Sequence, residues 1–280
     1  QHLVDVWGMD KVISKLAEQN WEKAAGVAEK LAQVELFTHK KHISGYPRTV
    51  AMYYRSIKNG GAQRVAAELC NIWAEMVDEA GNPLYKVILI TDEEEEKNSI
   101  KEYSLDPRVK RDCIPAVTKL TEGLYSRRYQ AWERVIREHG IDIVVTGMWV
   151  DPCILWDILS VKGQPSHPAF VIHCHSFTCA PYRFMGDKFA ELIYDYRISN
   201  GVVTLSEADQ RLVSCFTDYS KCISNPISFT VDSTVITERK DNTIVWAGRI
   251  SPEKQPFDAA YMMAHVVKKI PDARLYMIGQ

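Results

Sequence analysis

The chain has 280 residues, of which 46% are hydrophobic and 25% charged, the composition of an ordinary globular protein with material for one large or two smaller domains. Its formal net charge is only −2, so no global basic field would draw it to nucleic acid or anionic lipid. The sequence contains no apolar run near the ~18–20 residues of a transmembrane helix and no signal-peptide pattern at its start, and the absence of an initiating Met suggests a part of a longer protein.

The cysteine pattern argues against a disulfide framework or a zinc ribbon. The count is odd, the spacings are scattered, and no CxxC pair occurs. Most of these residues sit among apolar neighbours, so we expect reduced thiols and a cytoplasmic protein. The seven are Cys70, Cys113, Cys153, Cys174, Cys179, Cys215 and Cys222.

Residues 1–45 differ from the rest of the chain. Apolar residues recur there at roughly helical spacing among Lys, Glu and Gln, from Val12 to Val34, which predicts one or two amphipathic helices. We interpret this segment as a helical extension that packs on the protein or links it to an upstream module. A coiled coil would need more heptads.

From Arg48 onward, short apolar runs alternate with amphipathic helices. We expect strands at 49–54, 86–91, 109–114, 141–146, 169–173, 201–205 and 221–224, and helices at 62–77, 118–139, 151–160, 186–196 and 206–216. Strands that are almost continuously apolar are typical of parallel sheets covered on both faces. The pattern therefore predicts a doubly wound, Rossmann-like α/β domain over 46–227.

Local signals support several boundaries of this domain. Gly140 suits the end of the long helix, and Ser206, followed by Asp209, suits the start of a later one. The acidic run Asp92–Glu96 is most simply a solvated loop.

The polar segment 228–241 is expected to be a linker, after which the α/β pattern restarts over 242–280. It contains a strand at 243–246, a helix at 255–269 and a strand at 274–279. One βαβ unit cannot bury both faces of its sheet. We therefore expect it to be the first part of a second, incomplete Rossmann-like domain.

Gly60 and Gly61 lie between the first strand and the first helix. Ligands of open parallel sheets bind beyond the carboxyl ends of the strands, and a helix that begins with glycine lets an anion approach its backbone. The pattern is neither GxGxxG nor a P-loop. A tight turn without a ligand is the alternative.

His173 and His175 lie two residues apart at the end of a strand, so their side chains should point the same way. A metal site could use such a pair, but no third ligand has a suitable spacing. One of these residues could instead act as a hydrogen-bonding or polar catalytic group in a cleft, and a structural role is the remaining reading.

The loop Gly248–Lys254 joins a strand to a helix and contains two cations, Arg249 and Lys254. A guanidinium binds phosphate oxygens in a bidentate manner, and a nearby ammonium and helix start add positive charge. This combination suits a diphosphate, with two solvated surface cations as the alternative.

These motifs together resemble the retaining GT-B glycosyltransferases of the large family four. Trp246–Lys254, followed by Ile270–Leu275 and Ile278-Gly279, resembles the opening of the second domain of that family. Earlier segments fall in the same order, namely Asn59–Val65 for the glycine loop, His173–Ser176 for the "HxH" strand end, and Val203–Ser206 with Asn225–Ile227 before the hinge.

The resemblance implies a donor that is a nucleotide-diphosphate sugar, a saccharide or lipid-linked acceptor, and transfer with retention in polysaccharide or glycoconjugate synthesis. It implies no cofactor and no required metal. Arg249 and Lys254 would bind the donor diphosphate and stabilise charge on the leaving group. Gly60 and Gly61 would approach the donor phosphates and the acceptor, and His175, ahead of His173, would contact the transferred sugar.

The resemblance also leaves questions open. The family's E-x7-E donor motif belongs beyond Gln280, so residues 1–280 alone are expected to show little transfer. Acceptor-reading loops are expected at 92–108 and 176–190. The second of these is rich in aromatic residues, so it could face a membrane or a lipid-linked acceptor, with core packing or a lid as the alternatives.

Two other functions compete with glycosyl transfer. A nucleotide-sugar 2-epimerase would share the GT-B fold, but the Gly-Arg-x-Ser-x-Glu-Lys pattern argues against it. A non-catalytic, two-lobed α/β ligand-binding module of the periplasmic kind would be expected to have a signal peptide and few thiols.

Overall fold

The computed structural model describes residue 45 and residues 47–58, 60–92, 102–116, 122–151, 153–177, 189–227 and 242–279. The chain divides into two compact units between Ser228 and Phe229. The helices expected within 1–44 and the linker expected at 228–241 lie outside the described residues.

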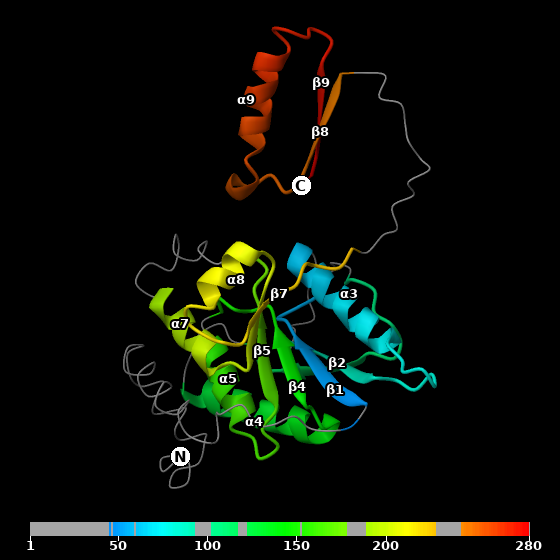
Figure 1. Ribbon diagram of the computed structural model, residues 1–280, viewed down its shortest axis with the longest axis vertical. Helices are drawn as coiled ribbons and strands as arrows, with labels where there is room; N and C mark the ends of the chain where they lie inside the picture. Colours follow the sequence, from blue (N-terminus) through cyan, green and yellow to red (C-terminus); the bar gives the residue numbers. More distant parts are fainter. Residues whose placement is uncertain are drawn as a thin grey trace. The chain divides into compact units, whose positions relative to one another are not determined.

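The first unit alternates strands and helices along the chain, as the apolar pattern predicts (Figure 1). Its strands are β1 (Arg48–Tyr53), β2 (Tyr85–Asp92), β3 (Lys110–Ile114), β4 (Ile143–Thr146), β5 (Ala169–His173), β6 (Gly201–Thr204) and β7 (Ser220–Cys222). Its helices are α3 (Gly61–Glu75), α4 (Glu122–His139), α5 (Ile154–Lys162), α7 (Phe189–Ile198) and α8 (Glu207–Val213).

All seven strands form one parallel sheet in the order β3-β2-β1-β4-β5-β6-β7. The chain builds outward from β1 to β2 and β3, then returns to add β4 on the other side of β1. The order of the strands therefore reverses between β1 and β4. This is the doubly wound, Rossmann-like sheet that the sequence predicts, and β1–β4 is its topological switch point.

Each face of the sheet has its own hydrophobic core. On one face, Met52 and Leu89 pack against α3 through Ala66 and Cys70. On the other face, Ala51, Ile88 and Ile90 pack against the α4 residues Trp132 and Val135, and this core continues through α5. Because successive side chains of a strand point to opposite faces, the neighbours Tyr53 and Tyr54 belong to different cores.

Two helix ends form as their sequence signals predict. Gly140 takes a φ of 63° after α4, and the amide of Ile141 donates to the carbonyl of Ile136 over 3.1 Å, the geometry of a glycine C-terminal cap. At α8, the Ser206 hydroxyl oxygen accepts from the amide of Asp209 over 3.1 Å, a side-chain N-cap.

The expectation that Asp92 begins a solvated loop is wrong. Asp92 is the last residue of β2 and only 9% exposed. Its carboxylate accepts a hydrogen bond of 2.9 Å from the Tyr53 hydroxyl, and Arg128 lies 3.7 Å away. Charge patterning alone placed Asp92 with the acidic residues that follow it, because the buried partners come from other strands and helices.

The second unit is one βαβ arrangement. β8 (Thr243–Ala247) pairs in parallel with β9 (Arg274–Ile278), and a 3-10 turn, η3 (Pro252–Lys254), and helix α9 (Pro256–Val266) connect them. Apolar side chains of both strands are exposed, among them Val245 and Ile278.

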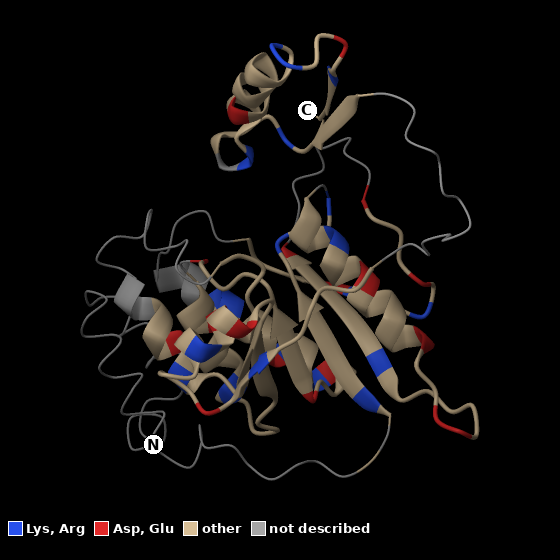
Figure 2. Ribbon diagram, turned by 45° about the horizontal axis from the view of Figure 1, so that its top comes forward, with Lys and Arg blue, Asp and Glu red and all other residues tan. Residues whose placement is uncertain are grey.

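Charges of both signs are interspersed along the described ribbon (Figure 2), in keeping with the small net charge of the chain. None of the helices in the described ranges is long and apolar enough to cross a bilayer.

Candidate active site

The switch point of the sheet brings three chain segments together at its carboxyl edge. Tyr54 follows β1, Gly147 follows β4, and Cys174 and His175 follow β5. These three strands are neighbours in the sheet, and a crevice at the switch point is where open α/β sheets bind their ligands.

His173 and His175 lie together, as their spacing predicts. Their ring centroids are 4.0 Å apart, and the His175 ring lies 6.1 Å from that of Tyr54. Tyr54 is 1% exposed and His173 is 6% exposed, while His175 is half-buried. The three rings therefore form one cluster, termed the Tyr-His-His cluster.

Each ring of the Tyr-His-His cluster carries a buried polar atom that has no hydrogen-bond partner among the described residues. These atoms are the Tyr54 hydroxyl, Nε2 of His173 and Nδ1 of His175. An unpaired buried polar group costs about 1–3 kcal/mol, and native proteins contain few of them. Three in one cluster at the switch point indicate a place where a ligand supplies the partners.

The cluster is uncharged at neutral pH. Burial lowers the pKa of His173 to about 4, and burial, with a further contribution from His173, lowers the pKa of His175 to about 3. Burial and the neighbouring Cys174 raise the pKa of Tyr54. The three groups can therefore donate and accept hydrogen bonds, but they bring no net charge to a ligand.

Gly147 fits against Tyr54 so closely that no other residue could take its place without displacement. A β-carbon on Gly147 would overlap the Tyr54 hydroxyl and lie 2.8 Å from Cδ2 of His175. Neither Gly147 nor Tyr54 was singled out from the sequence. Tyr54 ends an apolar run and Gly147 follows another, and their contact requires the pairing of β1 with β4.

The glycine loop begins α3, as its sequence predicts. Gly60 is the N-cap residue with a φ of 114°, and no side-chain hydrogen bond caps the helix there. A φ in this range strains any residue with a β-carbon, and such an atom would also overlap the Gln63 side chain. Asn59, the first residue of the expected motif, lies outside the described residues.

Tyr103 holds the glycine loop in place, a role that the sequence did not indicate. Its hydroxyl donates to the carbonyl oxygen of Gly60 over 3.1 Å, and its amide donates to the carbonyl of Ile57 over 3.3 Å. Tyr103 falls in the expected acceptor loop 92–108, of which residues 93–101 lie outside the described residues.

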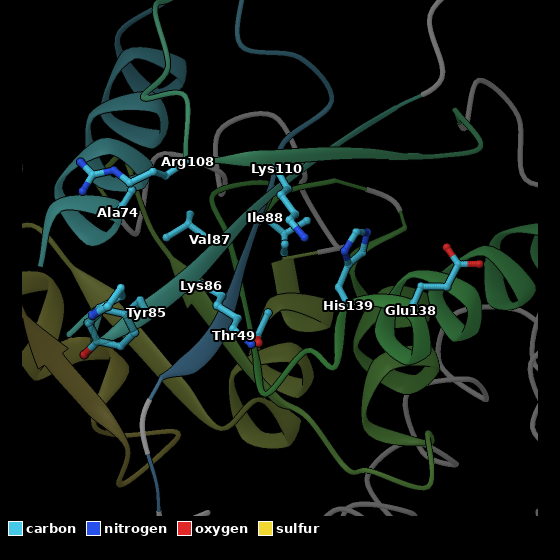
Figure 3. A pocket seen from close by; sticks show the side chains of 11 residues that line it. Thr49, Ala74, Tyr85, Lys86, Val87, Ile88, Arg108, Lys110, Glu138 and His139 are labelled. Atoms are coloured by element: carbon cyan, nitrogen blue, oxygen red, sulfur yellow. The ribbon is translucent and has the colours of Figure 1, made fainter. Parts of the chain in front are cut away.

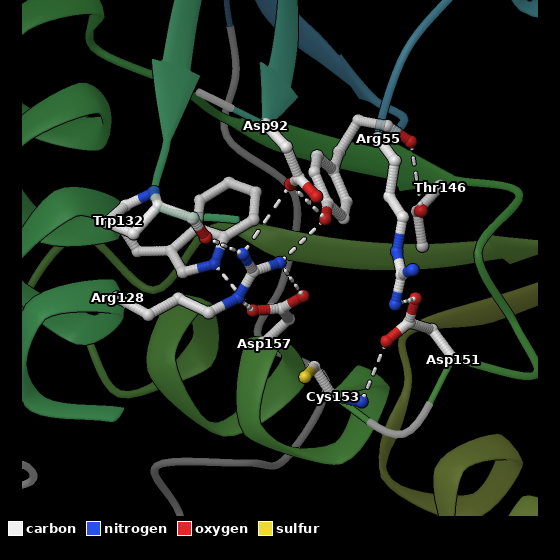
Figure 4. Close-up of polar contacts among 10 residues, drawn as sticks. Arg55, Asp92, Arg128, Trp132, Thr146, Asp151, Cys153 and Asp157 are labelled. Atoms are coloured by element: carbon white, nitrogen blue, oxygen red, sulfur yellow. Dashed lines mark hydrogen bonds and ion pairs between the residues drawn. The ribbon is translucent and has the colours of Figure 1, made fainter. Parts of the chain in front are cut away.

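Arg55 and Asp151 form an ion pair close to the cluster in sequence, since Arg55 follows β1 and Asp151 follows β4. The Arg55 guanidinium lies 2.5 Å from the Asp151 carboxylate, and Asp151 also accepts from the amide of Cys153 over 2.9 Å (Figure 4). The guanidinium nearest to Tyr54 in sequence, that of Arg55, is therefore already paired with a carboxylate.

In the second unit, the loop after β8 contains the two cations expected to hold a diphosphate. Arg249 and Lys254 are both exposed. The turn folds back on its strand, since the Trp246 indole donates to the carbonyl of Lys254 over 3.3 Å. A β-carbon on Gly279, just after β9, would overlap the carbonyl oxygen of Gly248, so the backbones approach closely at this edge.

Two other features of the first unit are less suited to be the site. A hollow of about 410 Å³ lies at the amino ends of β1 and β2, lined by residues that include Thr49, Lys86, Lys110 and His139 (Figure 3). It lies at the amino edge of the sheet, whereas the switch-point crevice lies at the carboxyl edge. None of the residues that line it has a buried polar atom without a partner in the described ranges. A search of the same ranges finds no group of His, Cys, Asp and Glu that could hold a metal ion.

No family model matches the sequence, and no curated protein matches it. Solved structures match the fold. The lipopolysaccharide outer core galactosyltransferase WaaB superposes with a TM-score of 0.54 at 12% identity, over 82% of this chain and 68% of WaaB. HepE of Anabaena in complex with UDP-glucose gives 0.51 at 11% identity, over 82% and 68%.

A third structure is a mutant form of TarM from S. aureus in complex with fondaparinux, α-GlcNAc-glycerol and UDP. It gives a TM-score of 0.56 at 10% identity, over 83% of this chain and 73% of TarM. At such identities the likeness concerns the fold alone. The chain therefore has the Rossmann-like α/β architecture of these GT-B proteins.

Proposed function

We propose that this protein is a glycosyltransferase that moves a sugar from a nucleotide-diphosphate sugar to a saccharide or lipid-linked acceptor with retention of configuration, in polysaccharide or glycoconjugate synthesis. The observation that carries the proposal is the Tyr-His-His cluster, an uncharged hydrogen-bonding site at the switch point of a GT-B-like sheet. Complexes of HepE with UDP-glucose and of TarM with UDP support a nucleotide-sugar donor.

The proposed roles divide between the two units. In transfer, the bond between the anomeric carbon and the donor diphosphate breaks, the oxygen of an acceptor hydroxyl bonds to the same face of that carbon, and the hydroxyl proton passes to the departing diphosphate. Arg249 and Lys254 bind the diphosphate and stabilise the negative charge that it gains. His175 contacts the transferred sugar with His173 beside it, and Gly60 and Gly61 let donor and acceptor approach the start of α3.

Two further properties belong to the same proposal. The two cations take the charge-neutralising role that a metal ion could play, so we propose that transfer requires neither a metal nor another cofactor. None of the cysteines in the described ranges forms a disulfide, which supports action in the reducing cytoplasm, at the inner face of the membrane where a lipid-linked acceptor is used.

Calorimetry of the purified full-length protein with UDP-glucose, UDP-galactose, UDP-N-acetylglucosamine and GDP-mannose tests the donor, since residues 1–280 alone are expected to show little transfer. We expect binding of at least one of them and slow release of its nucleotide. Arg249→Ala and Lys254→Ala should each weaken that binding about 10- to 100-fold, the loss of a charge-assisted contact. Lys268→Ala, an exposed cation of the same unit, serves as the matched control.

The outcomes separate the competing functions. Nucleotide release with NMR evidence of a retained anomeric configuration supports the transferase, and unchanged turnover in EDTA supports a metal-independent reaction. Conversion of UDP-N-acetylglucosamine to its 2-epimer would point to the epimerase, and failure of all four nucleotide sugars to bind would leave a ligand-binding module of another kind.

A further inference from the structure

We propose that Tyr54 is a third sugar-binding residue, whose hydroxyl, with the unpaired ring nitrogens of His173 and His175, binds hydroxyl groups of a neutral sugar unit near Gly147. The inference rests on the proposed function. To that function it adds one binding residue, Tyr54, and the kind of ligand group that is bound, an uncharged hydroxyl.

The topology of the sheet places Tyr54 where it can act with the two histidines. Tyr54 follows β1 and His175 follows β5, and only β4 lies between these strands. Gly147, at the end of β4, has no side chain to separate them, since a β-carbon there would meet both the Tyr54 hydroxyl and the His175 ring. The Tyr54 hydroxyl therefore lies close to the Cδ2 edge of the His175 ring.

The hydroxyl of Tyr54 contributes nothing to the fold through the described residues. It is buried and has no hydrogen-bond partner among them, whereas the aromatic ring belongs to the core packed against α3. Phenylalanine would fill the same core at no hydrogen-bonding cost. A tyrosine at this position is therefore accounted for by a partner that binds from outside the described chain.

The charges around the cluster select the kind of partner. Both histidines are neutral at pH 7 because burial holds the pKa of His173 at about 4 and that of His175 at about 3, and Arg55 is paired with Asp151. A phosphate or carboxylate would gain no ion pair from the Tyr-His-His cluster itself, which is costly in a buried site.

A sugar hydroxyl matches the cluster in both directions of hydrogen bonding. The tyrosine O–H can donate to it, and each imidazole offers a donor or an acceptor nitrogen according to its tautomer. A hydroxyl accepts and donates at once, so each hydroxyl of a sugar can pair with the Tyr54 hydroxyl or with an imidazole nitrogen in either tautomer. Where the ligand lacks that hydroxyl, the buried atoms remain unpaired, which is the physical basis of strong discrimination.

Tyr53 provides a matched comparison for the test because it is the preceding residue and its hydroxyl is fully used. It donates to Asp92 over 2.9 Å and accepts from Arg128 over 2.7 Å. The same substitution, tyrosine to phenylalanine, should therefore have opposite effects on stability at the two positions.

The first part of the experiment measures thermal unfolding of the wild-type protein, Tyr54→Phe and Tyr53→Phe. We expect the Tm of Tyr54→Phe to rise by about 1–4 °C, since an unpaired buried hydroxyl is removed, and that of Tyr53→Phe to fall by about 3–10 °C. A fall in Tyr54→Phe comparable to that in Tyr53→Phe would overturn the proposal, because the hydroxyl would then have a structural role.

The second part compares, by calorimetry, the affinity for each nucleotide sugar with that for its free nucleotide, UDP or GDP. Tyr54→Phe should lower the ratio of the two affinities about 5- to 30-fold and leave free-nucleotide binding unchanged. Arg249→Ala should weaken both ligands together. A ratio that stays within twofold of the wild-type value in Tyr54→Phe overturns the role of Tyr54 while the proposed function stands, whereas a wild-type protein that binds neither ligand overturns the function as well.

Discussion

Two groups of buried polar residues, one on each face of the central sheet, differ in their hydrogen bonding. On the α4 face, Arg128 donates to Asp157 through Nε and Nη2, each over 2.7 Å, and to the Tyr53 hydroxyl and the Pro115 carbonyl (Figure 4). The Trp132 indole also donates to Asp157, over 2.8 Å. On the α3 face, the Tyr-His-His cluster keeps three polar atoms without a described partner.

The contrast separates buried polar groups that stabilise the fold from equally buried polar groups that are available to a ligand. Arg128 and Asp157 tie α4 to α5, and their hydrogen bonds close on residues of the same unit, so this network stabilises the fold. The Tyr-His-His cluster has a similar position near the strand ends but leaves its hydrogen bonds open. Buried polar groups that the fold does not satisfy indicate a binding site better than burial or charge does alone.

The largest expected effect comes from breaking the satisfied network. Asp157→Ala leaves the Arg128 guanidinium buried with a lost ion pair, and we expect a loss of about 3–5 kcal/mol in the free energy of unfolding. Urea denaturation measures it. Glu207→Gln, in an ion pair whose side chains are both about four-fifths exposed, is the control and should change stability by less than about 0.5 kcal/mol. A loss in Asp157→Ala no larger than that in Glu207→Gln would show that the Arg128–Asp157 network does not stabilise the fold.

Gly147→Ala should have the next largest effect, and it falls on the α3 face. The added β-carbon displaces Tyr54 and His175, which we expect to cost about 1–3 kcal/mol of stability and to weaken sugar-dependent binding. Gly201→Ala is a suitable control, because a β-carbon there makes only ordinary contacts, the nearest at 3.6 Å from the carbonyl oxygen of Tyr219. Wild-type stability in Gly147→Ala would show that the cluster has room that the structure does not indicate.

The histidines should give the α3 face its own dependence on pH. Their pKa values are lower in the folded protein, about 4 and about 3, than the ordinary value near 6.5. The unfolded chain therefore takes up protons first, and stability falls as pH drops below about 6.5, by about 1.4 kcal/mol per pH unit for each ring until its folded pKa is reached.

Chemical denaturation at a series of pH values measures this slope, and the double variant His173→Gln/His175→Gln is the comparison. Tyr54, whose ring lies 6.1 Å from that of His175, and Cys174, which lies between the two histidines in sequence, have raised pKa values and do not titrate in this range. A slope between pH 6.5 and 4 that is the same in the double variant would assign the acid sensitivity to other groups.

The smallest expected effect concerns the glycine loop. Tyr103→Phe removes one hydrogen bond to the carbonyl of Gly60, which is worth about 0.5–1.5 kcal/mol. We expect a small loss of stability and weaker donor binding, since Gly60 loses its support. Tyr261→Phe, an exposed tyrosine of the second unit, is the control. The sign of the stability change is the decisive result, because Tyr54→Phe is expected to raise the stability of the protein.

The sequence predicts the fold well and the candidate site only in part. The apolar runs and helical spacing place the seven strands and the parallel doubly wound sheet, and Gly140 and Ser206 mark helix ends where they are found. Patterns within one segment determine these features. His173 and His175 are likewise brought together by local spacing alone.

The residues that the sequence did not reveal depend on contacts between distant segments. Tyr54 and Gly147 are separated by roughly half of the α/β domain in sequence, and their contact follows from the pairing of β1 with β4. Asp92 and Arg128 look like solvated charges until Asp157 and Tyr53 are placed around them. Strand order and packing across the sheet carry this information, and neither has a local signature.

The close approach of the two strand ends in the second unit bears on protein engineering. Any residue other than glycine at position 279 would collide with the peptide group of Gly248, so the end of β8 dictates what can follow β9. A chimera that takes β9 from a related protein should therefore keep glycine at position 279, whatever the rest of the grafted strand contains.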